Sequence, residues 1–143
     1  MTSPGAYCSN NSMRLIYIAG PYRAPTPWGR HLNIERARAY GAILPPLDVY
    51  PVIPHSNTAH MDGIADDEVF LEGTMELLRR CDGAIFIPGW EHSTGARAEQ
   101  DLCLTMCIPF CSVGLLTPQD ATPIIQEWLK DLSAVAVEVR RCP

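Results

Sequence analysis

The sequence predicts an α/β fold: a three-layer sandwich around a mainly parallel sheet of four to five strands. Short apolar runs rich in β-branched residues alternate along the chain with segments of helical periodicity, which is typical of this class. The chain has 143 residues, 47% of them hydrophobic and 19% charged, which matches one compact domain with a real core. We therefore expect a flexible segment over residues 1–12 and a single domain over residues 13–143.

The first half of the chain supplies two strands and one helix. Residues 15–19 form an apolar run that stops at a Gly-Pro pair, typical of a buried strand followed by a turn. Residues 30–44 carry apolar side chains at helical spacing and end before two prolines. Residues 49–53 predict a second strand, and Pro51 places it at a sheet edge because proline cannot donate to a central ladder.

The middle of the chain continues the alternation. The polar run 54–67 predicts a loop, and the helix after it carries one apolar stripe that ends near Cys81. Residues 84–87 predict the third strand, residues 95–106 a helix and residues 109–113 the fourth strand.

The C-terminal part predicts a helix and then a strand. Thr122-Pro123 is typical of a helix start, and the apolar residues that follow lie on one side of that helix. Val135, Val137 and Val139 alternate with other residues, so the tail predicts a last strand.

Composition excludes several classes of partner. A net charge of −5 and a pI near 5.2 argue against a nucleic-acid polymer. No run approaches the ~20 apolar residues that span a bilayer, so we expect a cytoplasmic protein with no membrane partner. Cys103, Cys107 and Cys111 repeat every four residues, but Pro109 interrupts that helix and no histidine cluster accompanies them. We expect neither a metal nor a cofactor.

Two loops carry the features that indicate a site. Gly20-Pro21-Tyr22-Arg23 follows the first predicted strand, and residues 89–95 follow the third. Strand ends of a parallel sheet meet at one edge, where ligands bind. The second loop opens a helix whose first N–H groups suit an anionic ligand such as phosphate, and Glu99 lies about one turn inside that helix.

Taken in order, five segments resemble the nucleoside 2-deoxyribosyltransferase-like superfamily, in particular its small bacterial and phage branch. The resemblance covers roughly residues 13–113, and its segments are residues 16–22, 33–37, 51–55, 77–82 and 90–99. It implies a flavodoxin-like or Rossmann-like sandwich that cleaves or exchanges the N-glycosidic bond of a nucleoside or nucleoside 5′-monophosphate. Glu99 matches the glutamate nucleophile, and Ser93 matches a serine that holds the 5′-phosphate.

The chemistry explains why a carboxylate is needed. A breaking sugar–base bond passes through an oxocarbenium-like state, which Glu99 either stabilises or traps as a covalent ester. Water then releases the sugar, giving a hydrolase, or a second base accepts it, giving a transferase. Tyr22 is a second catalytic candidate that lines the sugar pocket, and Arg23 adds a positive charge for phosphate.

One position departs from the resemblance. Where characterised relatives carry an aspartate, this chain has Thr74, which cannot ionise as an acid or base. Nearby acidic residues are candidates to compensate, namely Asp66, Asp67, Glu72 and Glu76. The departure keeps an alternative open: a nucleotide-binding sensor or interaction module that retained the pocket and lost the chemistry. A purely structural or metal-binding protein is the least favoured of these three functional classes.

The remaining binding candidates each have a structural alternative. The sequence around Ser93 fits a helix N-cap as well as a phosphate-binding serine. Trp90 is either a wall of the pocket or a lid on the core. His55 and His60 either contact the base or satisfy backbone groups. The candidate substrate-binding residues are Gly20, Arg23, His55, Thr74, Trp90, Ser93 and Gly95. We expect Asp82 and Asn33 to orient their surroundings, and the chain to form a homo-oligomer whose neighbouring subunit completes the pocket.

Overall fold

The computed structural model describes the backbone of residues 13–140 and the side chains of residues 13–133. Four parallel strands form one sheet in the order β2-β1-β3-β4. Their bounds are Leu15–Ala19 for β1, Tyr50–Val52 for β2, Gly83–Phe86 for β3 and Phe110–Ser112 for β4. The predicted three-layer α/β sandwich is confirmed. The segment predicted to be flexible, residues 1–12, lies outside the described residues.

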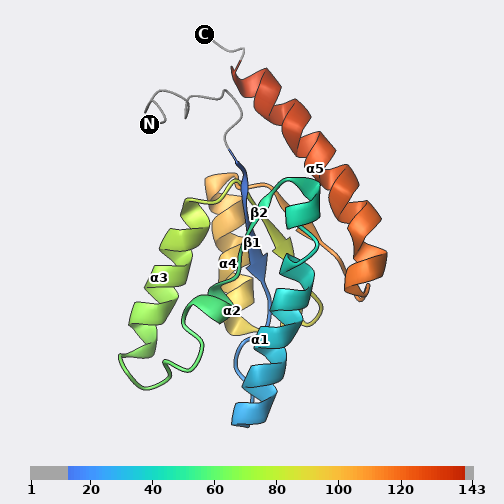
Figure 1. Cartoon of the computed structure of the whole chain (residues 1–143). Helices are drawn as coiled ribbons and strands as arrows, with labels where there is room; N and C mark the ends of the chain where they lie inside the picture. The colour runs from blue at the N-terminus through green and yellow to red at the C-terminus, as the bar shows by residue number, and fades with distance from the viewer. Residues whose placement is uncertain (1–12, 141–143) are drawn as a thin grey trace, which may run out of the picture.

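Helices cover both faces of the sheet (Figure 1). Helices α1 and α5 lie over one face, and α3 and α4 lie over the other. The helices are α1 (Pro27–Gly41), α2 (Pro54–Asn57), α3 (Asp67–Arg79), α4 (Thr94–Met106) and α5 (Pro118–Arg140), with short 3-10 helices η1 (Pro45–Leu47) and η2 (Trp90–His92). Both α1 and α4 begin at the edge of the sheet where the strands end.

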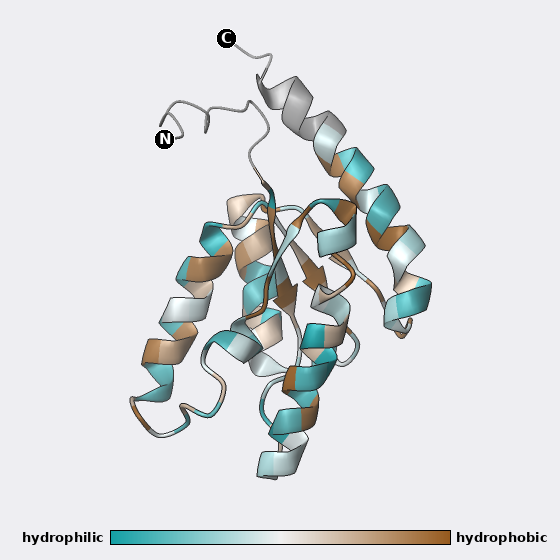
Figure 2. Ribbon diagram, viewed as in Figure 1, coloured by the Kyte–Doolittle hydropathy of each residue, from teal (hydrophilic) through white to brown (hydrophobic). Residues whose placement is uncertain are grey.

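The alternation of side chains along β1 divides the core into two layers. Ile16 and Ile18 pack beneath α1 and α5, whereas Tyr17 and Ala19 pack beneath α3 and α4. All four are fully buried, and Figure 2 shows the strands as the hydrophobic centre of the molecule. Burying each large aliphatic side chain contributes roughly 1.5–3 kcal/mol to folding. Tyr17 differs from the other three buried side chains of β1, because its hydroxyl also needs a hydrogen-bond partner.

The edge position of Pro51 is confirmed. Strand β2 pairs with β1 alone, with Pro51 opposite Ile16. The missing N–H of proline is tolerated there because an edge strand has one side free of ladder bonds.

Two helix starts differ from the sequence prediction. Helix α1 begins at Pro27, because Thr26 caps it by accepting a 3.0 Å hydrogen bond from the Gly29 N–H. The predicted start at residue 30 followed the apolar periodicity, which begins later than the cap. The predicted loop 54–67 contains the single turn of α2, which begins at Pro54.

The C-terminal prediction is wrong in two respects. Helix α5 begins at Pro118, not at Thr122, and the Thr117 hydroxyl accepts a 3.2 Å hydrogen bond from the Asp120 N–H. The predicted strand around Val137 is instead the end of this helix, which runs to Arg140. Val135 and Val139 are four residues apart, so this short alternation also fits a helix face. The described residues accordingly contain four strands.

Candidate active site

A hydrogen bond between a strand and a helix forms the centre of the candidate site. The Tyr17 hydroxyl, in the middle of β1, donates to the Glu99 carboxylate at 2.6 Å. Glu99 lies in the second turn of α4 and is 8% exposed. The carboxylate is thus held against the sheet by a helix, and Glu99 is not part of a solvated helix face.

Burial changes the acidity of both partners. Removal from water raises the pKa of Glu99 to about 7, although the hydrogen bond from Tyr17 opposes the rise. Burial and then the neighbouring carboxylate raise the pKa of Tyr17 well above 10, so the phenol keeps its proton. A carboxyl group with a pKa near neutrality exchanges between ionised and protonated forms under ordinary conditions, as catalytic carboxyl groups do.

The loops after β1 and β3 lie side by side, as predicted. The Ile87 N–H donates to the Ala19 carbonyl at 2.9 Å. A Cβ on Gly20 would lie 2.4 Å from Cγ1 of Ile87, and one on Gly89 would lie 3.0 Å from Cγ of Pro21. Gly89 also has a φ of 91°, which favours glycine. The close approach of the two loops therefore depends on both glycines.

Ser93 begins the helix that carries Glu99. Its hydroxyl accepts a 3.2 Å hydrogen bond from the Ala96 N–H, so it is the N-cap of α4. Gly95 follows inside the first turn and is half-buried. The capping alternative for Ser93 is therefore realised, and its O–H remains available to donate to a ligand.

Thr74 lies beside the Tyr17–Glu99 pair. It is half-buried on α3, donates to the Leu71 carbonyl at 3.0 Å, and acts on the Tyr17 phenol so as to lower its pKa. The position that resembles the aspartate of relatives is thus close to the Tyr17 phenol, which in turn donates to Glu99.

The acidic residues named as substitutes for that aspartate lie elsewhere. Asp66, Asp67, Glu72 and Glu76 are exposed. Asp67 pairs with Arg23 at 2.7 Å, and Glu76 pairs with Arg79 at 3.0 Å. None of the four replaces the missing carboxylate beside Glu99.

The first βα turn contacts the segment before α3. The Tyr22 hydroxyl donates to Asp62 at 3.0 Å, and Arg30 lies 3.9 Å from the same carboxylate. Burial and the Asp62 carboxylate raise the pKa of Tyr22. Because Arg23 is already paired with Asp67, the charge predicted to meet phosphate is neutralised by a carboxylate of this chain. The contact of Asp62 with Tyr22 and Arg30 was not predicted from the sequence.

The two histidines of the predicted loop differ in their surroundings. His55 is 5% exposed, and its Nε2 lies 3.1 Å from the carbonyl oxygens of both Gly20 and Pro21. It therefore satisfies the backbone and is not a free ligand for the base. His60 is exposed, with a φ of 64°.

Trp90 and Asn33 hold neighbouring structure. Trp90 packs edge-on against Phe86 at 5.2 Å and donates to the Ser112 hydroxyl, which makes it a lid on the core. Asn33 donates to the carbonyls of Tyr22 and Arg23 and anchors that turn, as expected. Asp82 accepts from the Leu15 N–H at the opposite edge of the sheet and takes no part in the site.

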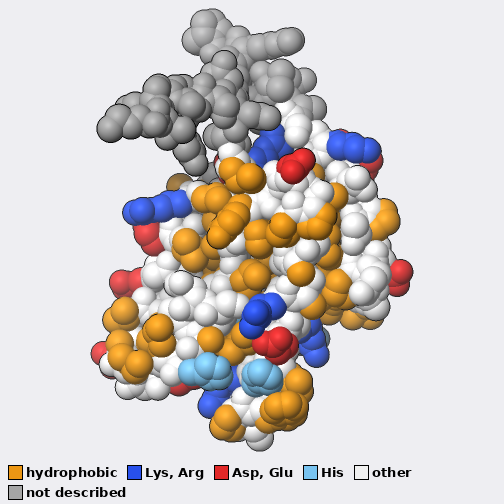
Figure 3. All heavy atoms as spheres, viewed as in Figure 1, with side chains coloured by type: hydrophobic (Ala, Val, Ile, Leu, Met, Phe, Trp, Pro, Cys, Tyr) orange, Lys and Arg blue, Asp and Glu red, His pale blue; other side chains and the backbone are white. Residues whose placement is uncertain are grey.

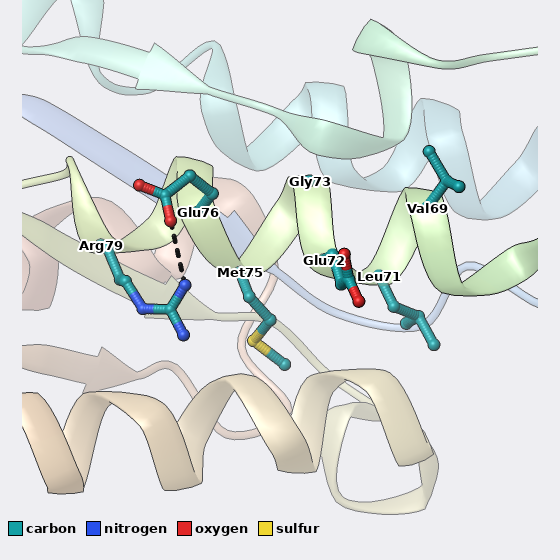
Figure 4. A pocket seen from close by; sticks show the side chains of 7 residues that line it. All are labelled: Val69, Leu71, Glu72, Gly73, Met75, Glu76 and Arg79. Carbon is teal, nitrogen blue, oxygen red and sulfur yellow. Dashed lines mark hydrogen bonds and ion pairs between the residues drawn. The ribbon is translucent and has the colours of Figure 1, made fainter.

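Two surface hollows lie near these elements. One, of about 50 Å³, is lined by Tyr22, Arg30, His60 and Asp62 among others. Figure 3 shows histidine, acidic and basic side chains gathered at the lower end of the molecule, where α1 begins. The other is an open groove of about 700 Å³ along the outer side of α3 (Figure 4). Neither is lined by Glu99, so the larger hollow is not the candidate site.

Tyr17 is a residue of the candidate site that the sequence prediction missed. A tyrosine in the centre of an otherwise aliphatic buried strand must find a partner for its hydroxyl, and that requirement was the available signal. The sequence could not name the partner, which is 82 positions away.

The described part of the chain has neither a cluster of metal-binding side chains nor a membrane-spanning helix. Among the side chains of residues 13–133, no group of three or more His, Cys, Asp or Glu is arranged to hold a metal ion. Cys103 lies on the buried side of α4, whereas Cys107 is exposed where that helix ends. No described helix is sufficiently long and apolar to cross a bilayer.

Comparison with known proteins adds one finding. A family model described as "Domain of unknown function (DUF4406)" matches residues 52–111, from the end of β2 into β4. The matched range includes His55, Ser93 and Glu99 and excludes β1 with Tyr17. No curated protein matches the chain significantly.

Proposed function

We propose that this protein is a cytoplasmic enzyme that cleaves or exchanges the N-glycosidic bond of a nucleoside or nucleoside 5′-monophosphate, with Glu99 as the nucleophile. The single observation that carries the proposal is the buried Tyr17–Glu99 hydrogen bond between the middle of β1 and α4. A lone buried carboxyl group is costly to the fold, and such groups cluster at functional sites. The resemblance to deoxyribosyltransferases supports the same residue.

The reaction follows from the position of one carboxylate oxygen. An oxygen of ionised Glu99 bonds to the anomeric carbon as the carbon–nitrogen bond breaks, and the electron pair of that bond leaves with the base. The base takes up a proton from solvent, and the proton that the attacking water loses in the second step returns to solvent. Water then attacks the same carbon and releases the sugar and the Glu99 carboxylate, or a second base attacks and forms a new nucleoside. No cofactor enters these steps.

The Tyr17 hydroxyl has a supporting part in this scheme. By donating to Glu99, it holds one carboxylate oxygen and leaves the other for the sugar. It also favours the ionised form that attack requires. Neither of the two hollows described above includes Glu99, so the proposal requires a sugar-binding space beside this carboxylate that is distinct from both.

The competing function is a nucleotide-binding sensor or interaction module. Thr74 beside the Tyr17–Glu99 pair favours it, because no carboxylic acid there can protonate the leaving base. Saturable nucleotide binding in calorimetry without any release of base would support this alternative.

A panel of nucleosides and their 5′-monophosphates tests the proposal, with free base measured by chromatography. We expect wild type to release base and Glu99→Ala to be slower by at least a thousandfold. Asp101→Ala is the matched control, because Asp101 is an exposed acid on the same helix and should leave the rate unchanged. Equal rates for wild type and Glu99→Ala would reject Glu99 as the nucleophile.

We also propose a homo-oligomer. The outer sides of α3 and α4 expose Val69, Leu71, Leu104 and Met106, which a second copy of the chain would cover. Light scattering after size exclusion should give a mass above 15.8 kDa for each particle, and a monomer at micromolar concentration would contradict this.

A further inference from the structure

Glu99 is an isolated charge in the described part of the chain. Among the side chains of residues 13–133, its carboxylate accepts a hydrogen bond from Tyr17 and forms no ion pair with a lysine, arginine or histidine. It is 8% exposed and lies beside the apolar cluster that surrounds Tyr17. When ionised, this carboxylate therefore lacks the opposite charge that buried ions ordinarily have beside them.

The described groups around this carboxylate are poor proton donors. Tyr17 on β1 donates to Glu99, and burial raises the pKa of its phenol well above 10. Cys103 on α4 and Cys81 after α3 are buried thiols, and burial raises the pKa of each to about 11. Thr74 on α3 lies close to the phenol and does not ionise. An efficient general acid has a pKa near the working pH, so none of these groups can efficiently protonate a leaving base.

Glu99 does not supply the proton in the proposed reaction. Burial raises its pKa to about 7, so a protonated form exists at neutral pH. The oxygen that attacks the anomeric carbon belongs to the ionised form, however, and that form carries no proton. A neutral nucleoside must therefore take the proton for its leaving base from solvent, and the described residues of the site do not assist that transfer.

We propose that the preferred substrate is an N-glycoside whose base carries a positive charge before the bond breaks, namely a pyridinium or N7-alkylated purine nucleoside or its 5′-monophosphate. An oxygen of ionised Glu99 bonds to the anomeric carbon, and the electron pair of the breaking carbon–nitrogen bond stays on the nitrogen and neutralises the ring. The base leaves as a neutral molecule without taking up a proton. Water then attacks the same carbon, loses a proton to solvent and releases the sugar and the carboxylate.

Charge favours the same class of substrate. The base is attached to the carbon that Glu99 attacks, so a cationic ring would lie close to the isolated carboxylate. Opposite charges attract more strongly in a buried site than in water. The net charge of −5 also favours the approach of a cation over that of an anion. The role of Glu99 in this inference rests on the proposed function, whereas the charge of the leaving base is a separate claim.

A matched pair of substrates tests this claim on the wild-type protein. 7-Methylguanosine and guanosine share the same sugar and differ by one methyl group and one positive charge at pH 6. Free base is measured by chromatography, and spontaneous release without protein is subtracted. We expect kcat/KM to be at least about a hundredfold higher for 7-methylguanosine, the lower end of what a general acid contributes to cleavage of a neutral nucleoside.

The outcomes of this comparison separate the two proposals. Equal kcat/KM values, or a higher value for guanosine, would overturn the preference for a cationic base and leave the proposed reaction in place. If neither compound loses its base, or if Glu99→Ala cleaves both as fast as wild type, the proposed function fails together with the inference.

The pH dependence gives a second test on the wild type. Nicotinamide riboside is the probe, because its pyridinium ring does not titrate. Attack requires ionised Glu99, so kcat/KM should rise as pH increases through about 7 and then stay constant up to pH 9. A decline on the alkaline side would show that a protonated group is required, and it would overturn the inference.

A substitution at Thr74 tests the link between the missing acid and the substrate. Thr74→Asp places an acid close to Tyr17, and this acid assists a neutral leaving base alone. We expect the preference for 7-methylguanosine over guanosine to fall at least about tenfold in this variant. Thr74→Asn, which has a similar size and no acidic proton, should keep the wild-type preference. An unchanged preference in Thr74→Asp would overturn the inference, and if this variant does not fold, the two wild-type measurements still decide it.

Discussion

The phenol of Tyr17 and the carboxyl group of Glu99 meet at 2.6 Å in the interior of the protein, although 82 positions separate them in the sequence. The contact joins the central part of β1 to α4, so it depends on the packing of the helix against the sheet. It places an ionisable group with a pKa of about 7 among the apolar side chains that contact Tyr17. A substitution of Tyr17 changes the pKa of Glu99, whereas a substitution of Glu99 removes the buried charge and changes the free energy of unfolding.

Tyr17→Phe should shift the pH dependence of base release. The hydrogen bond from Tyr17 lowers the pKa of Glu99 against the effect of burial, so its loss raises that pKa further above 7. Attack requires ionised Glu99, so the rate at pH 7 should fall about tenfold and should recover at higher pH. A pH–rate profile measures this shift. A uniform loss at all pH values would show that the phenol acts in some other way.

Glu99→Gln should stabilise the folded protein at alkaline pH. In the wild type the folded pKa of about 7 exceeds the unfolded value of 4.5, so the folded state binds more protons and stability falls as pH rises from 4.5 through 7. The shift corresponds to roughly 3 kcal/mol of unfolding free energy. The amide of the variant does not ionise, so urea unfolding should favour the variant at pH 8 and show a small difference at pH 4. Equal stability at both pH values would contradict the raised pKa.

Thr74→Asp should increase the rate of base release. A carboxyl group at this position lies beside the Tyr17–Glu99 pair and supplies an acid for the leaving base. General acid catalysis contributes typically ~10²–10⁴ in rate, and we expect a gain of at least tenfold at pH 6. Thr74→Asn is the matched control, since its amide has a similar size and no acidic proton. The same rate in all three proteins would mean that proton delivery does not depend on this position.

Gly20→Ala should destabilise the fold, whereas Gly73→Ala should not. A Cβ on Gly20 would meet Ile87 at 2.4 Å, and overpacking of this kind costs about 1–3 kcal/mol. Gly73 lies in the exposed middle of α3, where an added Cβ would have no neighbour within 4 Å, so alanine should stabilise that helix by about 0.5–1 kcal/mol. Thermal unfolding of both variants measures the contrast. An equal change in melting temperature for the two variants would show that the side chain of Ile87 moves aside and that its contact does not restrict position 20.

The regular elements were largely predictable because their signals are local. The apolar run 15–19 and the edge proline Pro51 identified their strands, and the buried side of α5 follows the predicted spacing of Ile125, Leu129 and Leu132. The errors also have local causes. The helix caps at Thr26 and Thr117 precede the periodic residues, and the alternating valines near the C-terminus satisfy a helix as well as a strand.

The candidate site was predictable only in part. Parallel strands must end at a common edge, so the sequence was enough to place the first βα turn beside the loop before α4. The sequence also identified Glu99 and Ser93 within that loop and helix. The contact of Asp62 with Tyr22 and the roles of His55 and Trp90 could not be predicted. They depend on which side chains of different elements meet, and spacing along the chain carries no information about such contacts.

The alternation of strands and helices along residues 13–113 and the edge position of Pro51 were predicted from the sequence alone, because periodicity and turn residues act over a few positions. Only the tertiary structure decided that Tyr17 donates to Glu99, that Arg23 is neutralised by Asp67, and that His55 binds backbone carbonyls instead of a ligand. These contacts join residues more than 30 positions apart, and their geometry is fixed by the close packing of helices on the sheet.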